Sequence, residues 1–180
     1  CAARAGQRGR SVVVLERNPV VAEKVRISGG GRCNFTNRDA GPSAFLSENP
    51  DFCRSALARY TASDFIHLVE KHGIPYHEKK LGQLFCDDSS RRIIDLLLAE
   101  CREGNVQVKT GVEVTAVRRT TDFEVETSAG TFHAPALVVA TGGLSIPKLG
   151  ATDLGYRIAE QFGVRIVPPR PGLVPFRLET

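Results

Sequence analysis

The sequence predicts an α/β fold: an open, doubly wound, mostly parallel sheet that carries a small antiparallel meander. Three observations predict it. Short apolar runs typical of buried strands stand at Ser11–Leu15 (SVVVL) and Leu137–Thr141 (LVVAT). Segments with helical spacing of apolar residues lie between these runs. After Gly104 the apolar residues alternate with polar ones, as they do in half-buried strands. Helices that alternate with buried strands are typical of doubly wound sheets.

The first half of the chain is expected to form one strand and several helices. Cys1–Gly9 has the small residues and the glycine stop of the second half of a helix, and Ser11–Leu15 follows as a strand. Phe52–His72 carries apolar residues at helical spacing, as one helix or as two that meet near Thr61. Ser89–Glu103 has serines that can cap it, an apolar stripe and a glycine stop. Because no strand precedes the first helix, we expect a Rossmann-like sheet that is incomplete at its N-terminus.

The second half is expected to be richer in strands. The run Val106–Val108 predicts a further strand of the main sheet, and alternation over residues 112–133 predicts the meander. Leu137–Thr141 returns to the main sheet and runs into two glycines. A helix is expected at about Asp153–Phe162, and another strand at Val164–Val167.

A cluster of prolines predicts the domain boundary. Pro168, Pro169 and Pro171 are typical of a linker, and the unfinished strand-like run Leu173–Leu178 follows them. We therefore expect residues 1–167 to form one domain. Residues 168–180 would form a linker and the start of a second domain that the chain does not include.

Composition favours an ordinary globular protein. The 180 residues are 42% hydrophobic and 24% charged, with a net charge of +4. The basic residues are scattered, so we expect no nucleic-acid partner, and the apolar runs are too short to predict a membrane span. Five cysteines without C-x-x-C spacing indicate neither a disulfide framework nor a metal site. A cytoplasmic protein with a small-molecule substrate is expected, and its oligomeric state stays open.

Glu16 stands where a dinucleotide-binding unit places an acidic residue, at the end of its second strand. There a carboxylate accepts hydrogen bonds from the adenosine ribose, about 20 residues beyond a G-x-G-x-x-G fingerprint. The fingerprint itself is absent from this chain. Taken alone, a glutamate at a strand end is more often an ordinary surface residue.

The run Ser28–Asn37 (SGGGRCNFTN) contains three consecutive glycines, which are costly to order. Such glycines are useful where the backbone must approach a planar or anionic ligand closely and present N–H groups to it. Arg32 can meet a phosphate or a carbonyl oxygen, and Asn34 offers both a donor and an acceptor. The alternative is a flexible surface turn.

A second glycine turn, Thr141-Gly142-Gly143, follows the predicted strand Leu137–Thr141. It would lie at the carboxyl edge of the sheet, where ligands bind in open α/β folds. A purely structural turn is an equally good interpretation of this motif by itself.

Together these segments resemble a known family. The runs SVVVLERNP, EKVRISGGGRCNFTN, LGQLF and LVVATGGLSIPKLGATDLGYRIAEQFG are similar to those of the BaiN-like flavoproteins, also catalogued as the aminoacetone-oxidase family or as HI-type FAD-binding proteins. The resemblance covers essentially the whole chain. It implies a Rossmann-like FAD-binding domain of the glutathione-reductase type, interrupted by a substrate domain, and it assigns residues 1–167 to a partial FAD/NAD(P)-binding domain.

The resemblance also implies roles for individual residues. Glu16 would hold the adenosine ribose, Arg17 would lie beside the adenine half, and the backbone of Val114 would pair with the adenine. Lys24 would act with the glycine run on the pyrophosphate and flavin sides of FAD. The residues of that run are Ser28, Gly29, Gly30, Gly31, Arg32, Cys33 and Asn34. The second turn, Thr141-Gly142-Gly143, would pass close to the middle of the cofactor. The family's usual glycine two residues before Lys24 is Ala22 here.

The expected function is that of an FAD-dependent oxidoreductase, in which the flavin transfers a hydride or an electron pair and NAD(P)H is the donor by resemblance. No residue is predicted to be catalytic. Cys33 is interpreted as a packing residue rather than a redox thiol, because the next cysteine lies twenty positions further on. The histidines are interpreted as surface or core residues. Two alternatives stay open: a non-enzymatic fragment that cannot retain FAD, and a flavoprotein that acts in RNA modification.

Overall fold

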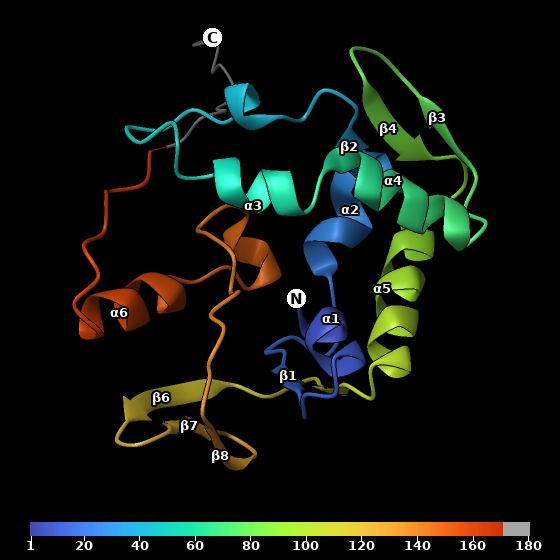
Figure 1. The fold of residues 1–180 in the computed structure, drawn as a ribbon. Coiled ribbons are helices and arrows are strands. Elements are labelled where there is room, and N and C mark those ends of the chain that lie inside the picture. Colours follow the sequence, from blue (N-terminus) through green and yellow to red (C-terminus); the bar gives the residue numbers. More distant parts are fainter. Residues whose placement is uncertain (171–180) are drawn as a thin grey trace, which may run out of the picture. The chain divides into compact units, whose positions relative to one another are not determined.

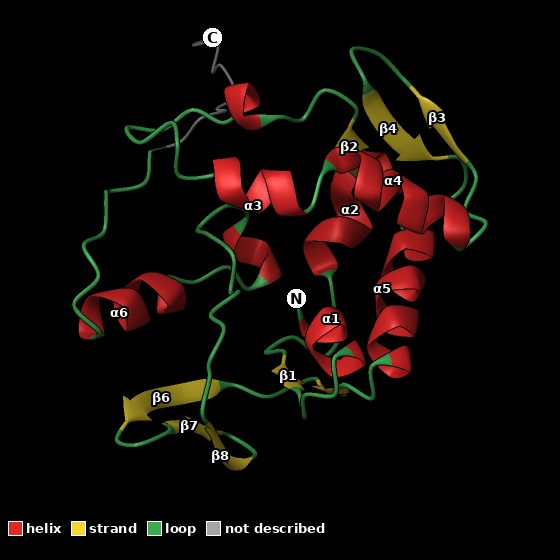
Figure 2. Cartoon of the chain, in the orientation of Figure 1, coloured by secondary structure: helices red, strands yellow, loops and turns green. Residues whose placement is uncertain are grey.

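A computed structural model describes residues 1–170 (Figure 1). The chain divides into two compact units, Cys1–Glu113 and a second that begins at Val114. Each unit is described by itself. Helices predominate in the first unit, whereas the second has a three-stranded sheet and a single α-helix in its described part (Figure 2).

The first unit contains the parallel pair that the sequence predicts. Strand β1 (Val13–Leu15) pairs in parallel with β5 (Gln107–Lys109), with Val14 opposite Val108. Helix α1 (Ala2–Gln7) packs closely on α5 (Arg91–Glu103) beside this pair. A Cβ atom added to Gly6 would collide with the backbone of Gly104, so the small residues of α1 permit this approach.

Helix α5 confirms the helix predicted over Ser89–Glu103. It buries Ile93, Ile94 and Leu96, whereas Leu97 is exposed. Its Glu100 carboxylate is also buried, and two hydrogen bonds compensate for its loss of contact with water. Glu100 Oε2 accepts from Gln7 Nε2 at 2.8 Å, and Glu100 Oε1 lies 2.9 Å from His72 Nε2.

The segment predicted as one helix or two is two helices. Helix α3 (Arg54–Arg59) ends before Thr61, and α4 (Ala62–Lys71) begins after it. A capping box separates them, in which Thr61 Oγ1 accepts from the Asp64 backbone N–H while the Asp64 carboxylate accepts from the Thr61 N–H. The side chain of Val69 from α4 is fully buried in the core of this unit.

A three-stranded antiparallel sheet, ordered β2-β4-β3, was not predicted. Its strands are β2 (Asn34–Asn37), β4 (Gln83–Cys86) and β3 (Tyr76–Glu78). Helix α2 (Glu23–Gly31) leads into β2, so the glycine run joins a helix to a strand.

The second unit contains the predicted meander. Strands β6 (Val114–Arg119), β7 (Phe123–Thr127) and β8 (Gly130–Ala134) pair antiparallel in sequence order. Helix α6 (Leu154–Gln161) confirms the helix predicted at about 153–162, and its Gln161 Nε2 donates to Val117 O at 2.7 Å. Short 3-10 turns occur at Pro42–Ala44 in the first unit and at Pro147–Leu149 in the second.

Two predicted strands do not form within the described residues. Leu137–Thr141 and Val164–Val167 have no strand partner there. An apolar run becomes a strand only where a neighbouring strand pairs with its backbone N–H and C=O groups, and neither run has such a partner within residues 1–170. The strand-like run Leu173–Leu178 and most of the predicted linker lie outside the described residues.

Across residues 1–170, no helix is both long enough and apolar enough to cross a membrane.

Candidate functional site

The glycine run forms a tight backbone turn at the end of α2. Ser28 leaves the helical conformation with ψ 148°, and Gly29, Gly30 and Gly31 then adopt φ of 58°, 66° and 84°. Left-handed backbone of this kind is readily available to glycine and strained for other residues. Cys33, at φ 53°, adopts it without being a glycine. The backbone conformation at this point therefore favours glycine at all three positions.

Gly29 has a second constraint, because it lies against the aromatic ring of Phe85 from β4. A Cβ atom at Gly29 would lie 2.7 Å from Phe85 Cε1 and 2.8 Å from the Asn34 backbone nitrogen. Gly30 and Gly31 have no such neighbour within 4 Å. The turn therefore contains Gly29, which contacts the Phe85 ring, and Gly30 and Gly31, whose Cβ positions face open space. The open space beside Gly30 and Gly31 would allow a planar ligand to approach the backbone closely.

The residues after the glycines fix the turn to the β2-β4-β3 sheet. The Cys33 N–H donates to Ser28 O at 2.9 Å, and Arg32 O accepts from the Cys86 N–H at 2.9 Å. Asn34, in the amide orientation that satisfies its neighbours, donates to the backbone oxygens of Thr36 and Leu84 at 3.2 and 3.3 Å. The Asn34 amide nitrogen thus adds a side-chain hydrogen bond across the strand pair to its backbone ladder.

Cys33 is a core residue, 4% exposed, and burial raises the pKa of its thiol. Cys86 lies in the same core cluster, and burial, followed by the neighbouring Cys33, raises its pKa to about 11. A thiol with a raised pKa is a poor nucleophile at neutral pH. This environment agrees with the interpretation of Cys33 as a packing residue.

Glu16 stands at the end of β1, as predicted. Its Oε1 accepts from the Asn18 N–H at 2.8 Å and so closes the turn that follows the strand. Arg17 pairs with Glu113 at 3.5 Å, with both side chains exposed. Lys24 lies in the first turn of α2, and Ala22, which caps that helix, has φ 60°. The left-handed conformation of Ala22 explains why a glycine suits this position.

A pocket of about 370 Å³ adjoins the glycine turn in the first unit. Its lining residues come from the turn and from the β3–β4 hairpin: Gly29, Gly30, Arg32, His77, Lys79 and Phe85. Sequence reasoning missed the last three as site residues. The run LGQLF, which ends at Phe85, carried the resemblance, but only the pairing of β3 with β4 brings His77 opposite Phe85.

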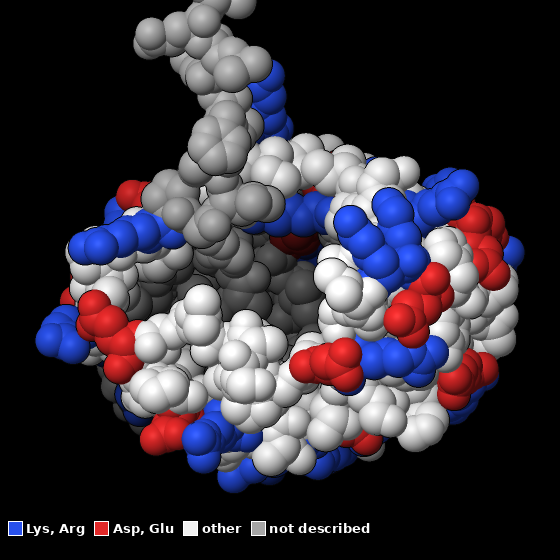
Figure 3. Space-filling view, turned by 90° about the horizontal axis from the view of Figure 1, so that it is seen from above, with Lys and Arg blue, Asp and Glu red and all other residues white. Residues whose placement is uncertain are grey.

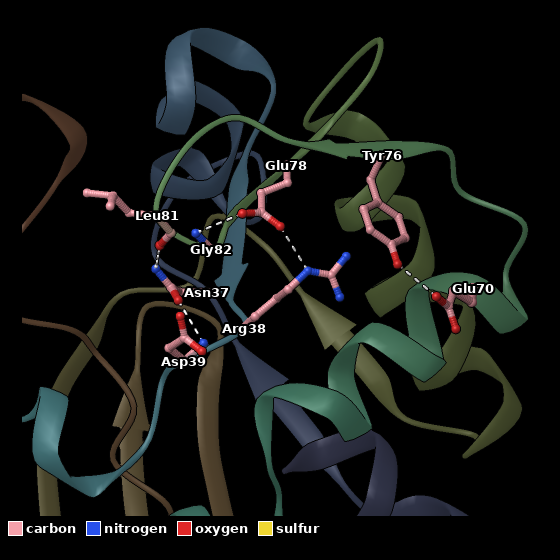
Figure 4. A network of polar contacts seen from close by, with 8 residues as sticks. All are labelled: Asn37, Arg38, Asp39, Glu70, Tyr76, Glu78, Leu81 and Gly82. Atoms are coloured by element: carbon pink, nitrogen blue, oxygen red, sulfur yellow. Dashed lines mark hydrogen bonds and ion pairs between the residues drawn. The ribbon is translucent and has the colours of Figure 1, made fainter.

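Contacts on the other side of the hairpin fasten it in place (Figure 4). Arg38 Nε lies 3.1 Å from Glu78 Oε2, and the Gly82 N–H donates to Glu78 Oε1. Asn37 Nδ2 donates to Leu81 O at 2.7 Å, and the Tyr76 hydroxyl donates to Glu70. The hairpin is thus a supported wall of the pocket.

The second unit holds the remaining predicted residues. Val114 opens β6 opposite Thr127, and Gly142 has φ 74°. Helix α6 packs tightly on the segment that precedes this glycine, since a Cβ at Gly155 would lie 2.6 Å from Thr141 Oγ1. A Cβ at Gly143 would lie 3.4 Å from the Tyr156 hydroxyl. The turn Thr141-Gly142-Gly143 is therefore shaped by its contacts with α6.

Comparison with known proteins identifies the family. The model of the HI0933-like protein Rossmann domain matches residues 1–177. This chain belongs to the HI0933-like family. The family's Rossmann domain agrees with the parallel β1–β5 pair and with the strand-end position of Glu16. The predicted fold class, a Rossmann-like FAD-binding α/β domain with an antiparallel meander, is confirmed.

Two curated relatives carry the same name. The "Ribosomal RNA dihydrouridine synthase" of Escherichia coli is 54% identical over 179 residues, which is 99% of this chain and 45% of that protein. The protein of that name from Haemophilus influenzae is 47% identical over 181 residues, 98% of this chain and 45% of that protein. A "3-dehydro-bile acid delta(4,6)-reductase" of Clostridium scindens is 27% identical over 93% of this chain and 41% of that protein. The chain therefore spans less than half the length of these relatives.

Solved structures show the fold alone, at low identity. The glycine oxidase of Geobacillus kaustophilus has a TM-score of 0.52 at 14% identity, covering 90% of this chain and 54% of that one. The Diels-Alderase PyrE3 of pyrroindomycin biosynthesis has a TM-score of 0.53 at 19% identity, covering 90% and 31%. Thermovibrio ammonificans THI4 has a TM-score of 0.51 at 10% identity, covering 91% and 58%.

One expectation is wrong, and another is supported only at a coarser level. The names of the two relatives overturn the exclusion of a nucleic-acid partner. The scatter of basic residues along the sequence was a poor basis for that exclusion. On the face drawn in Figure 3, Lys and Arg side chains lie directly beside Asp and Glu side chains. The net charge therefore does not tell which cationic side chains remain available to a ligand. The family match supports the HI0933-like family and not the narrower BaiN-like group.

Proposed function

We propose that this chain is the FAD-binding part of a flavoenzyme that reduces uridine to dihydrouridine in ribosomal RNA. One observation carries the proposal: a relative named for that activity is 54% identical over 99% of the chain. The left-handed glycine turn and the cationic pocket beside it support the proposal on physical grounds.

The residues present fit an FAD cofactor. Gly30 and Gly31 leave open space where side chains would stand, and Gly29 is wedged on Phe85, so the turn has the form of a cradle that Cβ atoms would fill. We propose that this turn, with Lys24, holds the pyrophosphate and flavin sides of the cofactor. Glu16 would hold the adenosine ribose, with Arg17 and the backbone of Val114 near the adenine.

When bound and reduced by NAD(P)H, the proposed electron source, FAD would supply the hydride that saturates the uracil double bond, while the second hydrogen is added as a proton. The chain's own residues would bind the cofactor and orient it. Arg32 offers planar guanidinium donors to a phosphate or a carbonyl oxygen at the pocket. Asn34 adds a hydrogen bond to the pairing of β2 with β4, and this pairing holds the turn against the ring of Phe85. Cys33 contributes packing.

The experiment uses a bacterial strain whose ribosomal RNA lacks dihydrouridine. The flavin absorbance of the purified protein and the nucleosides of ribosomal RNA from the complemented strain are measured together. We expect a yellow protein and restored dihydrouridine. Arg32→Ala should reduce both, whereas Arg59→Ala, at an exposed position on α3, should reduce neither.

The outcomes separate the alternatives. A yellow protein that leaves ribosomal RNA unmodified, and instead reduces a small enone, would move the proposal toward the activity for which the Clostridium scindens relative is named. A protein that stays colourless with added FAD would overturn the flavoenzyme proposal altogether and favour a fragment that cannot retain the cofactor.

A further inference from the structure

The β3–β4 hairpin presents two different faces. Leu84 and Cys86 of β4 are completely buried, and Phe85 between them points to the opposite side, as strand alternation requires. His77 is paired with Phe85 across the hairpin, and Lys79 follows two positions later. His77, Lys79 and Phe85 therefore share the face that lines the pocket beside the glycine turn.

His77 is held in one orientation. Its ring stacks on Phe85 with centroids 6.2 Å apart and an interplanar angle of 18°. Its Nδ1 lies 2.7 Å from Asp87 Oδ1, and since a carboxylate only accepts, that nitrogen carries the proton. The His77 side chain nevertheless stays 42% exposed. One ring face covers Phe85, so the other is available to a ligand.

The cations of the pocket are available as well. Lys79 Nζ lies 5.4 Å from the centroid of the Phe85 ring, over its face. Neither Lys79 nor Arg32 forms an ion pair with another residue of the described chain. The carboxylate of Asp87, which contacts His77 of this face, is engaged by the imidazole ring. An anion entering the pocket would therefore find two uncompensated positive charges.

We propose that this pocket receives one nucleotide of an RNA strand, with its base stacked on the open face of His77 and its phosphate beside Lys79. The inference rests on the proposed function and deepens it by naming where the substrate lies. Unpaired RNA bases stack on aromatic side chains, histidine included, and cationic side chains track the phosphates beside them. A ring stack with adjoining cations, next to the turn proposed for the flavin, offers both contacts.

Lys79 and Lys80 form a matched pair for the test. Both are exposed lysines of the hairpin, but only Lys79 lines the pocket. Binding of an unpaired ribosomal RNA oligonucleotide to the flavin-loaded protein is measured over a range of salt concentrations, with the flavin absorbance recorded for each variant. Lys79→Ala should weaken binding about tenfold and reduce the slope of log affinity against log salt by about 0.7, the value for one phosphate of a single strand. Lys80→Ala should leave the slope unchanged.

Two substitutions at His77 isolate the stacking contact. His77→Ala should weaken RNA binding about tenfold, in line with the loss of one stacked base. His77→Phe keeps an aromatic face without the hydrogen bond to Asp87, and it should retain most of the affinity. Both variants should keep their flavin, which also shows that they fold.

Three results would overturn the inference: equal effects at Lys79 and Lys80, wild-type affinity in His77→Ala, or loss of flavin rather than of RNA binding in Lys79→Ala. The last result would assign the pocket to the cofactor. Failure of the proposed function looks different, because the wild-type protein itself would then form no dihydrouridine.

Discussion

Gly29 lies so close to Phe85 that a Cβ atom at Gly29 would stand 2.7 Å from the ring carbon Cε1. Gly30, the next residue, has nearly the same backbone conformation, with φ 66° against 58°, but no atom within 4 Å of its Cβ position. The two glycines thus separate the effect of backbone strain from the effect of crowding on the ring.

Gly29→Ala should be more damaging than Gly30→Ala. An alanine in left-handed backbone costs about 1–2 kcal/mol at either position, and Gly29→Ala must also displace Phe85. We expect flavin retention to fall sharply in Gly29→Ala and modestly in Gly30→Ala, as measured by the ratio of flavin to protein absorbance. Urea unfolding gives the accompanying loss of stability. Equal losses in the two variants would show that contact with Phe85 does not matter.

Ala22→Gly should stabilise the protein. Ala22 has φ 60°, so glycine relieves left-handed strain, while the added freedom of the unfolded chain takes back part of the gain. The expected net gain is about 0.5–1 kcal/mol in the free energy of unfolding. Ala62→Gly, in the first turn of α4, is the control and should destabilise. No gain at Ala22 would indicate that its neighbours impose this conformation without strain.

The buried Glu100 should make stability depend on pH. The hydrogen bond from His72, then that from Gln7, lowers the pKa of Glu100 below its ordinary value of 4.5. A carboxyl group whose folded pKa is lowered contributes its full stability above 4.5 and loses it as the pH falls through the folded value. Glu100→Gln should therefore be less stable than wild type by about 1–3 kcal/mol at pH 7.

This difference should shrink steadily below pH 4.5, because protonated Glu100 resembles the glutamine. Urea unfolding of both proteins at a series of pH values checks it. Glu103→Gln, one turn further along α5 at an exposed position, serves as the control. A difference between wild type and Glu100→Gln that does not vary with pH would contradict the assigned role of the charge.

The cysteines should differ widely in reactivity. Cys33 and Cys86 are buried and their thiol pKa values are raised by burial, that of Cys86 to about 11, whereas Cys1 is exposed. Alkylation of the folded protein at pH 8, followed by mass spectrometry of its peptides, should label Cys1 first. Cys33 and Cys86 should react only when urea unfolds the chain. Rapid labelling of Cys33 in the folded protein would revive the redox interpretation.

Periodic patterns of apolar residues predicted the helices and strands that form within a single stretch of chain. The stripe of α5 and the alternation of β6, β7 and β8 lie within single stretches of chain, so periodicity revealed them. The β2-β4-β3 sheet escaped because its strands have three or four residues each and β2 pairs with β4 at Thr36 opposite Leu84, far away in sequence. Such pairing is specified by tertiary contacts, which no window of sequence contains.

The candidate site divides in the same way. The glycine turn is visible in the sequence because three glycines in a row are rarely needed for packing alone. The other wall of the pocket consists of His77, Lys79 and Phe85, whose spacing in the sequence indicates nothing until β3 and β4 are paired. The error about nucleic acid has a related cause, since net charge does not reveal which cations are already paired with acids.

The segment Leu137–Thr141 has a practical consequence for handling this protein. Its backbone has no strand partner in the described chain, and the side chains of Val138 and Val139 are 65% and 42% exposed. An apolar stretch with open N–H and C=O groups can pair with the same stretch of another molecule. Self-association through this segment would lower the concentration of free protein as the sample is concentrated. Titrations repeated at several dilutions will therefore separate true affinities from those lowered by aggregation.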